Sequence, residues 1–271
     1  MYKETKTLLF VQDLSAGYDG KTIIQNVNII VKDVIREGYD ATGQTIAVLG
    51  RSGRGKSTLF KALTGLLKPL SGQLLITDLS TANENDARPL TEGDMGFVDQ
   101  KYTLFRHKTI TQICEYALRK SKATKPEKDA LIKEYLTNWG LIEHKDKYSN
   151  ELSGGQRQRV AIIEQMLTSK HFMILDEPFS GLDVGNIEKV KQSLQRIGEA
   201  DELNTTIFST HDIRLAVELA DMIYVVGFPE GETISTIVKA YDLKAMGLAW
   251  KEYGDAHRAV VSDIKNLMLK S

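Results

Sequence analysis

The sequence has one cysteine, no long apolar run and almost no net charge. Cys114 is the single cysteine among 271 residues, which excludes an internal disulfide and disfavours a thiolate zinc site. The formal net charge of −1 gives no overall positive field to hold nucleic acid or an acidic membrane surface. Uncharged apolar runs stay well short of the about 18 residues that a membrane helix needs, and residues 1–7 do not resemble a secretion signal. We therefore expect a soluble, cytoplasmic chain that binds no nucleic acid.

Apolar strand patterns alternate with helical patterns along most of the chain. Apolar residues make up 42% and charged residues 26%, which is typical of a globular protein. Strands are predicted at residues 8–11, 27–31, 44–49, 74–76, 96–98, 172–175, 206–209 and 222–226. Helices are predicted at residues 58–67, 110–119, 126–139, 156–168, 186–197 and 213–220. The alternation favours an α/β fold with a parallel sheet covered on both faces, and the three successive helices after residue 110 indicate a helical insertion.

The last thirty residues carry a separate pattern. From Leu243 to Leu267, mostly apolar residues recur at three- and four-residue spacing, with His257 as the one polar member. This spacing predicts one face of a helix, weakened at Gly247 and Gly254. We expect the helix to dock on the body of the protein, and the alternative is a helix that binds a partner.

Residues 50–57 match the pattern G-x-x-x-x-G-K-[ST] at every fixed position, between a predicted strand and a predicted helix. Glycines allow the backbone to turn its N–H groups toward anionic oxygens, and the start of the helix adds partial positive charge. Lys56 supplies a full charge for the β- and γ-phosphates, and Ser57 offers a hydroxyl ligand to Mg²⁺. The segment predicts a site for a nucleoside triphosphate with Mg²⁺.

Two neighbouring acids end the apolar strand predicted at residues 172–175. Asp176 and Glu177 follow four apolar residues, and buried carboxylates at such a place need a cation or a proton. We expect Asp176 to face Mg²⁺. Pro178 biases Glu177 toward an extended backbone that directs its carboxylate elsewhere, as a general base for the attacking water requires.

A second anion-binding sequence occurs at residues 152–159, Leu-Ser-Gly-Gly-Gln-Arg-Gln-Arg. A serine and two glycines at the start of a helix again place N–H groups where an anion binds. One nucleotide does not need two such sites on one chain. Ser153, Gly154 and Gly155 are therefore predicted to bind the γ-phosphate held by a second subunit.

Together these motifs resemble an ATP-binding-cassette (ABC) ATPase subunit, the nucleotide-binding component of a membrane transporter. The resemblance covers residues 8–238 and its motifs occur in order. It implies a P-loop NTPase (RecA-like) core with an N-terminal antiparallel β-subdomain and a helical subdomain inserted at about residues 101–170. The implied ABC domain spans residues 1–240, and residues 241–271 form a C-terminal amphipathic helical extension.

The resemblance assigns roles residue by residue. It implies that Glu177, His211, Lys56 and Gln100 are catalytic, that Ser57, Gln100 and Asp176 hold Mg²⁺, and that Asp183 lies at a dimer interface. The implied ATP-binding residues are Tyr18, which would stack on adenine, and Gly50, Ser52, Gly53, Gly55, Lys56, Ser57, Thr58, Ser153, Gly154, Gly155 and Gln156.

The implied function is ATP-driven closing and opening of a dimer that powers transport. The second ABC subunit is expected to form a homodimer or a heterodimer with this chain, and the channel is expected on a separate transmembrane permease. This chain is expected on the inner face of the cell membrane. Residues 104–110 and 155–159 resemble importer subunits. The alternative is a soluble ABC ATPase in an assembly or repair complex. A P-loop kinase would have no use for residues 152–156.

Four residues depart from the usual family pattern. Arg51 and Arg54 stand in the phosphate loop where smaller or uncharged residues are usual, and they either add charge near the phosphates or are simply exposed. Asp99 precedes Gln100, and Glu164 stands where many members carry arginine. The stretch at residues 31–43 is longer than the usual turn. None of these departures removes a catalytic group.

Overall fold

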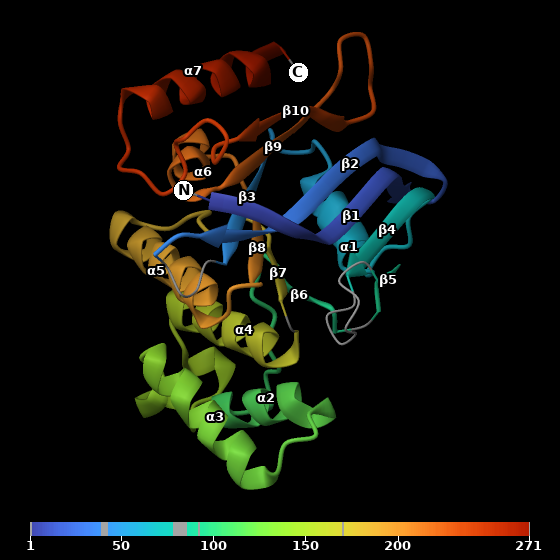
Figure 1. The fold of residues 1–271 in the computed structure, drawn as a ribbon. Coiled ribbons are helices and arrows are strands. Elements are labelled where there is room, and N and C mark those ends of the chain that lie inside the picture. The colour runs from blue at the N-terminus through green and yellow to red at the C-terminus, as the bar shows by residue number, and fades with distance from the viewer. Residues whose placement is uncertain (1, 39–42, 78–85, 92, 170, 271) are drawn as a thin grey trace.

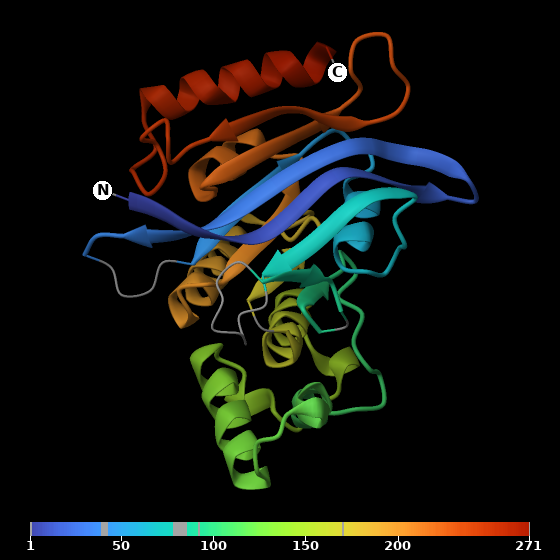
Figure 2. The same cartoon turned by 45° about the vertical axis from the view of Figure 1, so that its right-hand side comes forward.

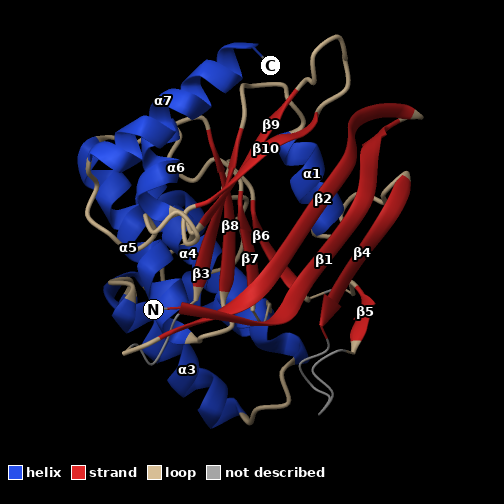
Figure 3. Cartoon of the chain, turned by 45° about the horizontal axis from the view of Figure 1, so that its top comes forward, coloured by secondary structure: helices blue, strands red, loops and turns tan. Residues whose placement is uncertain are grey.

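The computed structural model describes residues 2–38, 43–77, 86–91, 93–169 and 171–270. Two sheets lie beside each other, with helices around them (Figures 1 and 3). A group of helices projects away from the sheets at one end, and the C-terminal helix lies at the other (Figure 1). In the described part of the chain, no helix is both long enough and apolar enough to span a membrane.

The first sheet is antiparallel and has the order β2-β1-β4-β5. Its strands are β1 (Tyr2–Tyr18), β2 (Lys21–Arg36), β4 (Ser71–Thr77) and β5 (Ala87–Pro89). Asp19 and Gly20 join β1 to β2 with positive φ at both positions, as a tight two-residue hairpin requires. The strands predicted at residues 8–11 and 27–31 are thus the middles of two much longer strands, and part of the long stretch before the phosphate loop belongs to β2.

The second sheet holds the strands that carry the predicted site. Its order is β10-β9-β3-β8-β7-β6, and all pairs are parallel except β9 with β10. The strands are β3 (Gln44–Leu49), β6 (Met95–Val98), β7 (Phe172–Leu175), β8 (Thr205–Thr210), β9 (Met222–Gly227) and β10 (Thr236–Asp242). The sequence predicted all of these except β10. Parallel strands end at one edge, so the residues that follow β3, β6, β7 and β8 meet there.

The helices cover both faces of this sheet. They are α1 (Lys56–Leu63), α2 (Ile110–Ala117), α3 (Lys125–Asn138), α4 (Gly154–Thr168), α5 (Val184–Ala200), α6 (Ile213–Leu219) and α7 (Asp255–Lys270), with short 3₁₀ turns at Leu118–Lys120, Ile142–His144 and Ser149–Glu151. Between β6 and β7 the described residues form helices and turns without another strand. Of these helices, α4 contacts β6, while α2 and α3 project away from the sheet (Figures 1 and 2).

Alternate side chains of β3 divide the core into two parts. Ile46 and Val48 pack with α1 and the antiparallel sheet, whereas Ala47 and Leu49 pack with the helices on the opposite face. All four are at most 2% exposed, as expected for a central parallel strand. The predicted mixed α/β architecture is confirmed.

The single C-terminal helix expected from Leu243 onward is wrong in its first half. Strand β10 extends to Asp242, turns occupy residues 243–254, and α7 begins at Asp255. Gly247 has φ +67°, which a right-handed helix does not permit, and the amides of Leu248 and Ala249 both bond to the Leu243 carbonyl. Apolar spacing alone did not distinguish a helix from turns that bury the same residues.

The expected docking of the C-terminal helix on the body of the protein is confirmed. Helix α7 packs against α6 and buries His257, Val260 and Ile264. His257 Nε2 donates to the Leu248 carbonyl at 3.1 Å, and its Nδ1 accepts from the Gly254 amide at 3.1 Å. Because both ring nitrogens have partners, the polar member of the stripe is buried without an unpaired group.

Candidate nucleotide-binding site

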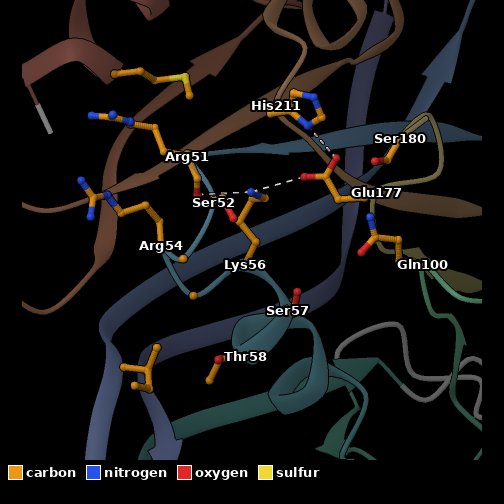
Figure 4. A pocket seen from close by; sticks show the side chains of 14 residues that line it. Arg51, Ser52, Arg54, Lys56, Ser57, Thr58, Gln100, Glu177, Ser180 and His211 are labelled. Atoms are coloured by element: carbon orange, nitrogen blue, oxygen red, sulfur yellow. Dashed lines mark hydrogen bonds and ion pairs between the residues drawn. The ribbon is translucent and has the colours of Figure 1, made fainter. Parts of the chain in front are cut away.

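A cavity of about 760 Å³ lies at the carboxyl ends of the parallel strands (Figure 4). It collects residues that are distant in sequence but follow neighbouring strands. The lining residues that the sequence predicted as site residues are Ser52, Gly53, Gly55, Lys56, Ser57, Thr58, Gln100, Glu177 and His211. Arg51, Arg54, Ile23, Ser180 and Met268 also line it and were not predicted as site residues.

The phosphate loop has a shape that depends on glycine. Gly53 and Gly55 have φ of +79° and +86°, in the left-handed region that side chains disfavour. A methyl group at Gly50 would lie 2.7 Å from the Val226 carbonyl oxygen. Gly55 is also the N-cap of α1, so the first free N–H groups of that helix belong to the loop. The loop therefore turns closely over β9 and presents the amino end of a helix to the cavity.

Lys56, Glu177 and His211 form a connected chain across the cavity (Figure 4). Lys56 Nζ donates to the Gly50 carbonyl at 2.7 Å and lies 3.4 Å from Glu177 Oε1. Glu177 Oε2 lies 3.0 Å from His211 Nδ1. The lysine side chain is 8% exposed and the glutamate 15%, whereas the histidine is 66% exposed. Solvent thus reaches this chain of groups from the histidine side.

The backbone at Glu177 contradicts the extended conformation expected before Pro178. Glu177 has φ +49°, and its amide donates to Ser209 Oγ at 2.8 Å. A non-glycine residue in this region costs about 1–3 kcal/mol and persists only where its surroundings fix it. The turn nevertheless separates the two acids as expected, because Glu177 points toward Lys56 and His211 while Asp176 does not.

Asp176 is 6% exposed and is held by a residue that the sequence reasoning missed. The hydroxyl of Ser209, on β8, donates a hydrogen bond to Asp176 Oδ1 at 2.5 Å. Ser209 Oγ also accepts a hydrogen bond from the Glu177 amide. Ser209 lies two residues before His211, which is the one signal in the sequence that could have found it. Of the predicted metal set, Ser57 and Gln100 line the cavity, whereas Asp176 does not. Hydroxyl, amide and carboxylate oxygens are the kind of ligand that Mg²⁺ prefers.

The predicted second anion site lies at the amino end of α4 and does not line the cavity. Ser153 Oγ accepts the Gln156 amide at 3.3 Å, and Gln156 Oε1 accepts the Ser153 amide at 2.8 Å. A methyl group at Gly154 would have no described atom of this chain within 4 Å, and one at Gly155 would lie 3.7 Å from Asn186 Oδ1. None of the described residues therefore requires glycine at residue 154.

Tyr18 and Asp183 lie outside the cavity lining, as Gly50 and Asp176 do. Tyr18, at the end of β1, is 41% exposed, and Lys61 Nζ lies 5.8 Å from its ring centre. Asp183 is the N-cap of α5, and its Oδ1 accepts the Asn186 amide at 2.8 Å. The structure of one chain explains Asp183 as a cap and leaves the Tyr18 ring accessible from solvent.

Comparison with known proteins decides the family. The family model described as ABC transporter matches residues 40–180, which is more than half of the chain. The chain belongs to the ABC transporter family.

ABC relatives match most of the chain. The sulfate/thiosulfate import ATP-binding protein CysA of Synechococcus elongatus is 33% identical over 89% of this chain, and CysA of Pseudomonas aeruginosa is 30% identical over 96%. This chain covers 66% of the first relative and 76% of the second, so it is shorter than both.

Solved ABC structures share the fold. CbiO1 of Clostridium perfringens, part of the ABC transporter complex CbiONQ, is 27% identical with a TM-score of 0.71, over 98% of this chain and 96% of that one. An ATP-binding subunit of an ABC transporter is 21% identical with a TM-score of 0.67, over 94% of this chain and 99% of that one. These likenesses confirm the predicted P-loop NTPase fold.

Three departures from the usual ABC pattern can now be placed. Arg51 is exposed at the cavity, and its carbonyl accepts Lys56 Nζ at 3.4 Å. Arg54 is half-buried, and its guanidinium carbon lies 3.8 Å from the ring centre of Phe228. The alternative that Arg54 is simply an exposed arginine is therefore not what the structure shows. Asp99 is exposed directly before Gln100. Both arginines therefore add positive charge to the cavity.

Glu164 is a half-buried acid on α4. Burial raises the pKa of its carboxyl from 4.5 to about 7, and the positive charge of Arg119 opposes part of this rise. The folded protein favours the protonated form of Glu164. The contribution of this group to the stability of the folded protein is therefore fully present below pH 4.5 and is lost as pH rises through about 7.

Glu164→Gln is therefore expected to remove this pH dependence. The variant should be more stable than the wild type at pH 8 by about 3 kcal/mol and should differ little from it at pH 4.5. Urea unfolding at the two pH values measures the difference. Glu115→Gln, at an exposed position of α2, is the matched control. It should change the free energy of unfolding by the same amount at pH 8 and at pH 4.5. Equal stability of Glu164→Gln and the wild type at pH 8 would contradict the burial argument.

Proposed function

We propose that this chain is the ATP-binding and ATP-hydrolysing subunit of a transporter, with import as the direction. The observation that carries the proposal is the chain of contacts from Lys56 through Glu177 to His211 beside a glycine-shaped phosphate loop. The CysA relatives are named as import ATP-binding proteins, which supports import. ATP and Mg²⁺ are the proposed ligands.

Lys56 would bind the β- and γ-phosphates of ATP together with the N–H groups of the loop and α1. A phosphate oxygen must compete with Glu177 for Lys56, because the lysine now lies 3.4 Å from that carboxylate. Mg²⁺, when bound, neutralises charge on the phosphate oxygens, and Ser57, Gln100 and Asp176 would hold it. Binding of ATP would thus free the Glu177 carboxylate.

Glu177 would then accept a proton from the water that attacks the γ-phosphate. His211 Nδ1, 3.0 Å from Glu177 Oε2, positions that carboxylate at the exposed end of the contact chain. Ser209 fixes the backbone of the base and the Asp176 side chain at once, so base and metal ligand keep a constant separation. A positioned base of this kind contributes about 10²- to 10⁴-fold to a rate.

A second ABC subunit is the proposed partner at the nucleotide. Ser153, Gly154, Gly155 and Gln156 lie at the start of α4, away from the cavity of their own chain. The free N–H groups of a helix start attract an anion, and the open space at Gly154 leaves room for one to approach. This surface would contact the γ-phosphate bound to the other subunit, with Asp183 near the same interface and Tyr18 stacked on adenine.

The transmembrane path is proposed to lie on separate permease subunits, with this chain on the inner face of the cell membrane. Capture of the tagged chain from membranes should bring down a protein with several membrane spans together with a second ABC subunit. A soluble scaffold as the sole partner would contradict the transport role.

Ser153→Arg tests the pairing of subunits. Arginine at the helix start should block approach to the neighbouring nucleotide, so turnover should fall about tenfold or more, whereas MgATP binding to the same chain should stay unchanged. Phosphate release and equilibrium nucleotide binding are the two measurements.

Two variants separate this effect from simpler ones. Ser153→Ala removes the cap, which costs about 1 kcal/mol of stability, without adding bulk. Ser262→Arg adds the same charge on an exposed position of α7. If Ser153→Ala lowers turnover as strongly as Ser153→Arg, loss of the cap and not blocked pairing explains the result.

A further inference from the structure

The carboxyl end of the C-terminal helix reaches the nucleotide cavity. Met268, in the last turn of α7, lines the cavity together with the phosphate loop and His211. The helix runs alongside β10, with its carboxyl end toward the loop that joins β9 to β10 (Figures 1 and 2). The apolar stripe predicted from the sequence did not place this helix near the phosphate loop, and none of the predicted catalytic or binding roles falls on it.

Contacts along its whole length hold α7 in this position. Val260 and Ile264 are 5% and 0% exposed, and Leu267 and Met268 are half-buried against the same core. Ile264 is four residues after Val260, and Leu267 and Met268 are three and four residues after Ile264, so one face of the helix continues from the core to the cavity. Met268 is thus the cavity end of a packed face.

Polar contacts also attach the helix and the residues just before it to their neighbours. Lys239 Nζ and Tyr241 Oη, both on β10, each lie 2.7 Å from Asp263 Oδ2. The Arg214 guanidinium of α6 lies 5.0 Å from the ring centre of Tyr253, just before α7. The helix is therefore attached to both β10 and α6, and these attachments set where Met268 lies.

The chemistry of Met268 differs from that of most of the cavity. Charged, hydroxyl and N–H groups suit the phosphates, whereas the carbon-rich surface of a nucleoside gains from apolar contact. Ile23 is a second aliphatic lining residue, and its Cγ2 lies 3.2 Å from the position of a methyl group at Gly55. An unbranched thioether adapts to an irregular ligand surface better than a branched side chain does.

We propose that Met268 contacts the bound nucleotide and that the last turn of α7 is a wall of its binding site. Nucleotide binding and docking of α7 then stabilise each other, because a contact made only when both are in place strengthens both equally. This inference rests on the proposed ATP-binding function.

Met268→Ala tests the contact in the full-length chain. With MgADP as the probe, we expect the dissociation constant to rise about three- to tenfold, the scale of losing part of one buried apolar side chain. Leu269→Ala is the matched control, since Leu269 is the next residue on α7 and is 70% exposed. Leu269→Ala should bind MgADP as the wild type does.

Met268→Trp gives a fluorescence signal that should respond to MgADP only if residue 268 contacts the nucleotide, and not if the residue has a purely structural role. The emission of the added tryptophan should change when MgADP binds, relative to the wild type with its own Trp139 and Trp250. Leu269→Trp should show no such change. Backbone hydrogen exchange in residues 264–270 of the wild type should also slow with MgADP.

The outcomes separate this inference from the proposed function. If the wild type binds MgADP but Met268→Ala binds it equally well and the emission of Met268→Trp does not change, Met268 does not contact the nucleotide. If the wild type itself does not bind MgADP or MgATP, the proposed ATP-binding function fails, whatever the variants do.

Discussion

Glu177→Gln is expected to slow ATP hydrolysis by about 10²- to 10⁴-fold, the range over which a positioned general base acts. Glutamine keeps the shape of the side chain and can still hydrogen-bond to His211, but it cannot take a proton from water. It also loses the negative charge that lies 3.4 Å from Lys56 Nζ. MgATP should therefore bind at least as tightly as to the wild type, and the closed dimer should accumulate.

Phosphate release under saturating MgATP measures the rate, and equilibrium nucleotide binding measures the affinity. Glu188→Gln, at an exposed position of α5, makes the same chemical change away from the cavity lining and should leave both unchanged. Hydrolysis by Glu177→Gln at nearly the wild-type rate would remove Glu177 from the role of base.

Lys56→Met should weaken MgATP binding by about 10²-fold or more. Hydrogen bonds to charged groups contribute about 1.5–3 kcal/mol each, and this lysine is expected to contact two phosphates. Methionine has a similar length and leaves no large cavity, so the loss reports the charge. The Gly50 carbonyl also loses its 2.7 Å donor, which adds a modest cost in stability.

Lys68→Met is the matched control, because it removes one positive charge from an exposed position after α1. Nucleotide binding by isothermal titration should distinguish the two variants. Wild-type affinity in Lys56→Met, with the fold intact by circular dichroism, would show that the cavity does not hold the phosphates through this lysine.

The sequence predicted the parts of the cavity that depend on short-range order. A glycine pattern between a strand and a helix determines the shape of the phosphate loop, and acids at the end of an apolar strand must emerge at the edge of a parallel sheet. Lys56, Glu177 and Gln100 could therefore be expected in one place, and the structure brings them together.

Other features depend on contacts that no local pattern records. Ser209 joins the two acids because β8 lies next to β7, and sequence spacing does not specify strand order. Met268 reaches the cavity because β10 turns the chain back and residues 243–254 form turns, whereas the apolar stripe predicted a continuous helix. The positive φ of Glu177 overrides the local preference of a residue before proline, because Ser209 and the following turn hold it there.

The two ends of the chain have very different surroundings, which matters for anyone who attaches a tag or a dye. Tyr2 packs edge-on against Trp250, with ring centres 5.9 Å apart, and the amino end is separated from the carboxyl end in every view (Figures 1 to 3). A peptide fused after α7 would emerge two residues beyond Met268, beside the cavity mouth. A handle or fluorophore near Tyr2 would therefore lie farther from the cavity than one attached next to Met268.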